Sequence, residues 1–73
     1  MNKELIDKYI NDINELGFNK NLTLNSKDVS KILSVKPRTL DNWRKENLGP
    51  NCKKIGKAYI YTKRDVAEFL AQN

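Results

Sequence analysis

Apolar side chains recur at helical spacing near the start of the chain. At about 100° per residue, one stripe of a helix collects Leu5, Ile6, Tyr9, Ile10, Ile13 and Leu16. We expect an amphipathic helix over residues 2–16, ended by Gly17, which can adopt positive φ. The stripe either covers the core or pairs two protomers. We favour the core, because so short a chain needs every apolar face it has.

The next apolar pattern predicts two short helices joined by a tight turn. Asn25 or Ser26 can cap the first helix, since both side chains accept hydrogen bonds from first-turn amides. This helix is expected to reach about Leu33, with residues 34–36 as the turn. Pro37 suits the first position of the second helix, where its missing N–H costs nothing.

The second helix has a clear inner side. Leu40 and Trp43 are three residues apart, which places both toward the core. We expect Leu48 to return to the core and the Gly49-Pro50 pair to end the helix, with glycine taking the positive φ.

The last third of the chain predicts a β-hairpin and a final helix. Two β-prone runs, residues 53–55 and 58–61, flank the dipeptide Gly56-Lys57, which suits a two-residue turn. Thr62 and Asp65 have the spacing of a capping box, which starts a helix there. The order predicts a mainly α fold with a small β-hairpin, a winged helix-turn-helix with an extra N-terminal amphipathic helix. We expect one domain over residues 1–73, with the extra helix in 1–18 and the winged part in 22–73.

Charge is distributed unevenly along the chain. The net charge is +5, but residues 1–24 carry three cations against four anions, whereas residues 25–73 carry eleven cations against five anions. A basic excess confined to one region is typical of proteins that bind polyanions. A lysine-rich soluble surface is the plainer interpretation of the same numbers.

Composition excludes several kinds of site. With one cysteine, Cys52, and no histidine, the chain can form neither an internal disulfide nor a Cys/His zinc site. Histidine-based catalysis is absent and no phosphate-cradling loop is present, so we expect no enzyme, no metal and no cofactor. No apolar run approaches the roughly 18–20 residues that span a bilayer, and the N-terminus lacks a secretory core. We therefore expect a cytoplasmic protein without a membrane partner.

The predicted second helix carries the candidate base and phosphate contacts. A helix fits the DNA major groove, and its N-terminal residues reach base edges. The candidates there are Lys36, Arg38, Thr39, Asn42, Arg44 and Lys45. The helix before the turn adds Ser26 and Lys27, and the hairpin adds Lys53, Lys54, Lys57 and Tyr59.

Each group of candidates has a structural alternative. The helix residues can form an ordinary solvated face with Asp41 and Lys45 paired at i,i+4. The hairpin lysines can protect an edge strand from aggregation. Tyr59 and Tyr61 share one strand face, and we expect at least one of them to pack against the core.

These features together resemble a known family. The matching positions are residues 24–33, 37–40, 43–46, 48–50, 54–56, 61, 65–66 and 69–70. Over residues 22–70 the chain resembles the excisionase-type, MerR-like winged helix domain of phages and mobile elements. The resemblance implies a recognition helix (Arg38, Thr39, Asn42, Arg44) in the major groove and a hairpin on the backbone or adjacent minor groove. Ile60 stands where relatives often have arginine, which favours lysine–phosphate contacts for the hairpin.

The expected function is sequence-specific binding of double-stranded DNA. The resemblance implies either an excisionase-like recombination directionality factor, which works with an integrase, or a small transcriptional regulator. The protein is expected to act as a monomer, a homodimer or a cooperative array on DNA. The alternative is a protein-interaction module, in which the N-terminal stripe docks a partner helix and the basic face meets an acidic protein.

Overall fold

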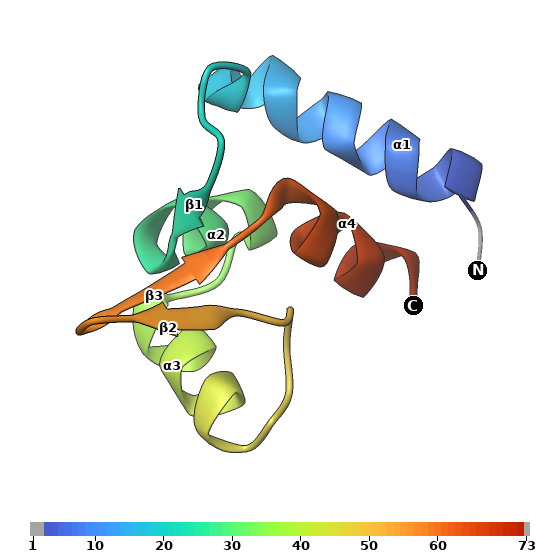
Figure 1. The fold of residues 1–73 in the computed structure, drawn as a ribbon. Coiled ribbons are helices and arrows are strands. Elements are labelled where there is room, and N and C mark those ends of the chain that lie inside the picture. The colour runs from blue at the N-terminus through green and yellow to red at the C-terminus, as the bar shows by residue number, and fades with distance from the viewer. Residues whose placement is uncertain (1–2, 73) are drawn as a thin grey trace.

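The structure is a computed structural model that describes residues 3–72 (Figure 1). Along the chain it contains α1 (Lys3–Ile13), a short π-helical segment η1 (Asn14–Phe18), β1 (Leu24–Asn25), α2 (Ser26–Leu33), α3 (Pro37–Lys45), β2 (Lys53–Ile55), β3 (Ala58–Tyr61) and α4 (Lys63–Ala71). This mostly helical arrangement with a small antiparallel sheet confirms the winged helix-turn-helix fold expected from the sequence.

The three strands form an antiparallel sheet in the order β1-β3-β2. The predicted hairpin is present, and Gly56 has φ 63° at the first turn position, as a type II′ turn requires. Strand β1 adds a two-residue edge, in which Leu24 lies opposite Tyr61. Both of these side chains are buried, so the sheet face that carries them faces the core.

Local capping fixes where α2, α3 and α4 begin. The Asn25 side chain accepts a hydrogen bond from the Asp28 amide at 2.8 Å, and Thr62 accepts one from the Asp65 amide at 3.0 Å. Both form reciprocal capping boxes. Pro37 occupies the first turn of α3, as predicted.

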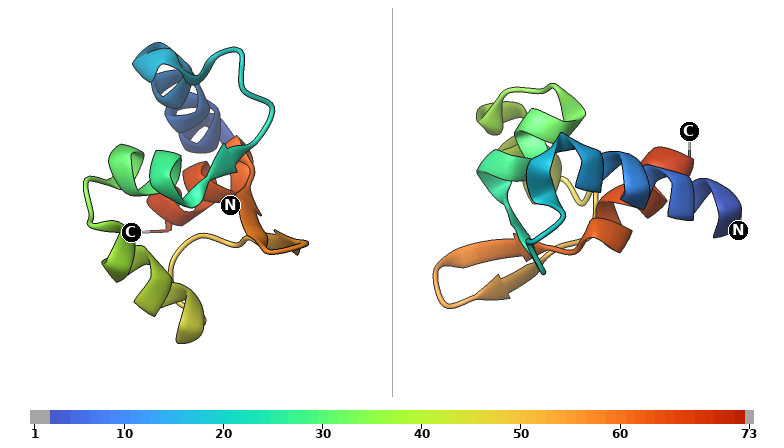
Figure 2. Two further views of the ribbon diagram at one scale, coloured as in Figure 1. Left: turned by 90° about the vertical axis from the view of Figure 1, so that its left-hand side faces the viewer. Right: turned by 90° about the horizontal axis from the view of Figure 1, so that it is seen from above.

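Helix α1 packs against α4, which the three views of the chain show from different sides (Figure 1, Figure 2). Ile6 and Ile13 are buried there, and Lys63 Nζ of α4 donates a hydrogen bond to Asn14 Oδ1 at 2.7 Å. The intramolecular role of the N-terminal stripe is therefore confirmed for these two residues. The expected start at residue 2 lies outside the described part of the chain.

The N-terminal stripe ends earlier than the sequence suggested. The α-helix stops at Ile13 and continues as η1, in which Gly17 has φ 106°. Leu16 is 64% exposed and does not join the core. The change in helical winding after Ile13 moves Leu16 off the face that meets α4.

The end of α3 also differs from the prediction. Asn47 has φ 59°, and its N–H donates to the Arg44 carbonyl while the Leu48 N–H donates to the Trp43 carbonyl. This Schellman pattern makes Asn47, rather than Gly49, the residue that ends the helix. Leu48 is 55% exposed, so its predicted return to the core is wrong.

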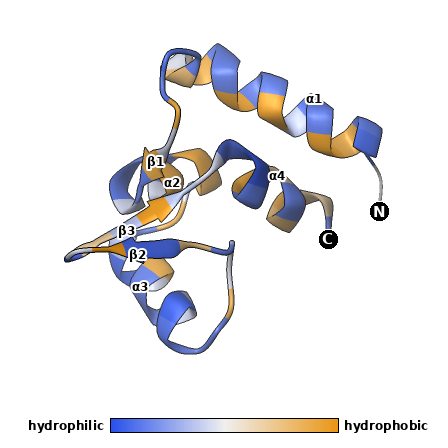
Figure 3. Cartoon of the chain, viewed as in Figure 1, coloured by the Kyte–Doolittle hydropathy of each residue, from blue (hydrophilic) through white to orange (hydrophobic). Residues whose placement is uncertain are grey.

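The core joins α3 to the rest of the fold. Leu40 is buried with Leu24, Val29, Tyr61 and Val66. Trp43 is half-buried, its ring centroid 5.9 Å from that of Phe69 in α4. A Cβ on Gly49 would approach the Trp43 ring to 3.3 Å, so the loop passes close over this side chain. Figure 3 shows the resulting alternation of hydrophobic and hydrophilic positions along the helices.

Candidate nucleic-acid interface

The face of α3 opposite Leu40 is open to solvent. Arg38, Asn42 and Lys45 are exposed, Thr39 is half-buried, and Lys36 is the exposed N-cap residue. The structure thus groups five of the six predicted recognition-helix residues on or beside one accessible surface. A guanidinium, a carboxamide and two ammonium groups on one helix provide donors and acceptors suited to base edges and phosphates.

The N-terminus of α2 holds the next two predicted residues. Lys27 is exposed, whereas Ser26 is half-buried at the first position of the helix. Burial raises the pKa of the Tyr61 hydroxyl, with Cys52 acting in the same direction and Arg44 and Ser26 in the opposite direction. Ser26, which directly follows the β1 strand that pairs with Tyr61, therefore lies near this buried tyrosine, at the same end of the helix that exposes Lys27.

The three hairpin lysines do not share one face. Lys54 lies opposite Tyr59 in the β2–β3 pairing, so both side chains lie on the inner face of the sheet with Tyr61. Lys53 lies opposite Ile60 on the outer face, and Lys57 is in the turn. Lys54 Nζ is 5.8 Å from the centre of the Tyr59 ring. The hairpin therefore presents Lys54 toward the α3 side and Lys53 away from it.

Arg44 differs from the other predicted residues on α3. Its guanidinium carbon lies 3.7 Å from the centre of the Tyr59 ring, and Nη1 lies 2.7 Å from Asp41 Oδ1. Only 20% of the Arg44 side chain is exposed. The Asp41 carboxylate raises the pKa of Arg44 above its ordinary value, against the opposing effect of burial. The structure thus places Arg44 between α3 and the hairpin.

The ion pair on α3 is not the one weighed from the sequence. Asp41 pairs with Arg44 at i,i+3 rather than with Lys45 at i,i+4. Lys45 has no ion pair within residues 3–72, so its ammonium group is available to a ligand. The carboxylate that stands beside the exposed cations is itself partly neutralised by Arg44.

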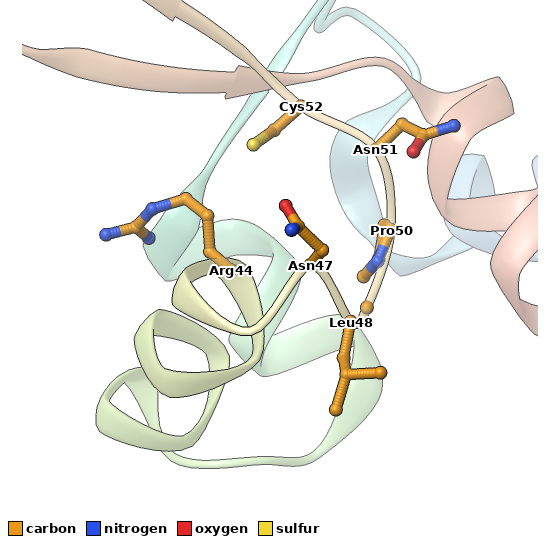
Figure 4. Close-up of a pocket in the computed structure, with 7 residues that line it drawn as sticks. Arg44, Asn47, Leu48, Pro50, Asn51 and Cys52 are labelled. Carbon is orange, nitrogen blue, oxygen red and sulfur yellow. The ribbon is translucent and has the colours of Figure 1, made fainter.

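A shallow recess lies beside Arg44, between the end of α3 and the loop to β2 (Figure 4). It measures about 200 Å³ and is lined by Arg44, Asn47, Leu48, Gly49, Pro50, Asn51 and Cys52. Leu48 points away from Cys52 in this view. No cluster of three metal-ligating side chains occurs within the described residues, and none of their helices is long and apolar enough to span a membrane.

Comparison with known proteins identifies the region that contains this surface. Residues 23–73 match the family model described as a helix-turn-helix domain, which is well over half of the chain. No curated protein and no solved structure matches the chain.

Proposed function

Because the chain belongs to the helix-turn-helix domain family, and the helix-turn-helix is a DNA-binding motif, we propose that it binds double-stranded DNA in a sequence-specific manner. In this proposal α3 enters the major groove and the β2–β3 hairpin lies on the adjacent backbone or minor groove. The observation that carries the proposal is the exposed face of α3, where Arg38, Asn42 and Lys45 stand opposite the buried Leu40.

Each side chain on that face has a role that its chemistry suits. Arg38 can donate two hydrogen bonds to guanine, Asn42 can pair with adenine, and the Thr39 methyl group can contact thymine. Lys36 and Lys45 suit phosphates, which position the helix without reading the sequence. Lys27 at the start of α2 and the hairpin residues Lys54 and Lys57 are exposed and would extend the phosphate contacts beyond α3.

Two cellular roles follow from the sequence resemblance over residues 22–70. One is an excisionase-like directionality factor that bends DNA and assists an integrase, acting alone, as a homodimer or as a cooperative array. The other is a small transcriptional regulator. A circular-permutation mobility assay on the selected site tests the first role, because an architectural factor must bend its site, and an unbent complex would exclude it.

A protein-interaction module receives less support. That alternative relied on a free apolar stripe along α1, whereas Ile6 and Ile13 are buried within the chain. We therefore propose no partner helix for this stripe.

The test is a random-sequence binding selection at two salt concentrations, followed by fluorescence anisotropy on the enriched duplex. We expect a defined motif and an affinity that falls steeply with salt, by about one unit of log–log slope per phosphate contact. An enriched motif without salt dependence would contradict the proposed backbone contacts. Equal affinity for all duplexes would reduce the function to non-specific binding.

A further inference from the structure

The contact between α3 and the hairpin depends on one stacked side chain. The Arg44 guanidinium lies 3.7 Å from the centre of the Tyr59 ring, and Asp41 holds it in place from α3 at 2.7 Å. A planar guanidinium can stack on an aromatic face and donate hydrogen bonds at its edge at the same time. This arrangement connects the last turn of α3 to the middle of β3.

At the base of the hairpin Tyr61 is buried in the core and Tyr59 packs against it, whereas residues 53–58 are all exposed. All three residues of β2 are exposed, and the third strand, β1, pairs only with Ile60 and Tyr61 at the base. The turn and the first two residues of β3, Ala58 and Tyr59, extend beyond that pairing. An isolated two-stranded hairpin is marginally stable in water, so a contact at Tyr59 has a large influence on where the tip lies.

The same contact occupies Arg44. With most of its side chain covered and its guanidinium shared between a carboxylate and a ring, Arg44 is poorly placed to reach a phosphate. Lys45, its exposed neighbour, has no such partner within residues 3–72.

We propose that Arg44 is a positioning residue, which fixes the hairpin relative to α3 through its stack on Tyr59 so that both elements reach DNA together. This inference rests on the proposed DNA binding and deepens it. It predicts that the hairpin lysines contribute to affinity only while the stack is intact. It also predicts that lysine cannot replace Arg44, because an ammonium group is neither planar nor able to stack in this way.

The first experiment uses the free protein, without DNA. Amide hydrogen exchange is measured for Arg44→Lys and for the matched control Arg64→Lys, which makes the same change at an exposed position on α4. We expect exchange of the β2–β3 amides to accelerate by about tenfold in the Arg44 variant, and not in the control, since local opening sets these rates. Unchanged hairpin exchange would overturn the proposal whatever the protein binds.

The second experiment uses DNA and a double-mutant cycle. Lys57→Ala removes a cation from the hairpin turn, away from the Arg44–Tyr59 contact. We expect it to weaken binding of the wild-type protein by about threefold and of the Arg44→Lys protein hardly at all, because coupled residues are non-additive. If Lys57→Ala instead weakened both proteins equally, and Arg44→Lys bound DNA as tightly as wild type, Arg44 would be a phosphate contact.

A second variant covers the case in which Arg44→Lys unfolds. Tyr59→Leu removes the ring, leaves Arg44 in place and should release the hairpin in the same way. If hairpin exchange accelerates in these variants but wild type shows no salt-dependent DNA binding, the stack is real and the proposed function is wrong. If wild type binds DNA but the cycle shows no coupling, the positioning role is wrong and the proposed function stands.

Discussion

Helices α1 and α3 bury apolar residues in the same way but present different chemistry to solvent. On α1, Ile6 and Ile13 face the protein, while the outer face mixes charges, with Lys8 and Asp12 paired at 3.2 Å. On α3, Leu40 faces the protein and the outer face carries Arg38, Asn42 and Lys45. The acidic residue of α3, Asp41, is paired with Arg44.

The buried face of each helix fixes its position in the fold, whereas the exposed face determines which partner the helix can bind. Burial of a stripe positions both helices, and it is driven by the same removal of apolar surface from water. The exposed carboxylates Glu4 and Asp7 would repel a phosphate backbone from α1, whereas the exposed Arg38 and Lys45 of α3 would attract one in the proposed function. Amphipathicity alone therefore does not distinguish the two helices, and the charge of the outer face is what makes α3 the candidate for DNA binding.

The largest expected effect tests whether α1 is part of the fold. Ile6→Ala should lower the free energy of unfolding by about 2–5 kcal/mol, because it leaves a cavity against α4. Leu16→Ala, at an exposed position, should change it by less than about 0.5 kcal/mol. Urea denaturation followed by circular dichroism measures both.

A stable Ile6→Ala variant would give the α1 stripe a different role. If Ile6→Ala kept its stability but converted a dimer to a monomer in light scattering, the α1 stripe would be an interface between protomers. Both helices would then bind a partner: α1 would bind a second protomer and α3, in the proposed function, would bind DNA.

The second prediction tests the outer face of α3. Arg38→Ala should weaken binding to the selected duplex by about 1–3 kcal/mol and relax the base preference at one position. Lys8→Ala on α1 makes the same change in net charge and should leave affinity and preference nearly unchanged. A repeated binding selection with each variant measures both quantities. An unchanged preference for Arg38→Ala would make this arginine part of an ordinary solvated surface.

Features that depend on a few neighbouring residues were predictable from sequence. The caps at Asn25 and Thr62, the start of α3 at Pro37 and the Gly56 turn all follow from interactions within four residues. The end of α3 was not predictable in this way. Two nearby residues, Asn47 and Gly49, both adopt positive φ, and the helix ends at the first of them.

The role of Arg44 illustrates a different limit. Its spacing from Asp41 is visible in the sequence, but Tyr59 lies in a separate strand and reaches Arg44 only through the fold. Its position on the predicted helix and the family resemblance therefore grouped Arg44 with the exposed residues of α3. The hairpin lysines were grouped because all three are basic residues of one predicted hairpin, although strand alternation already separates Lys53 from Lys54.

The placement of Lys53 and Lys54 on opposite faces of the sheet gives the smallest predicted effect, which tests which face of the hairpin meets DNA. Lys54→Ala and Lys53→Ala remove the same charge one residue apart, from opposite faces of the sheet. Lys54 lies on the α3 side, so its loss should remove one phosphate contact. The slope of log affinity against log salt concentration should then fall by about one unit, and binding should weaken to the same extent for every DNA sequence. Lys53→Ala should have little effect on either quantity, as measured by anisotropy at four salt concentrations. Equal losses would mean that the hairpin acts through its overall charge, and a larger loss at Lys53 would place the DNA against the outer face of the sheet.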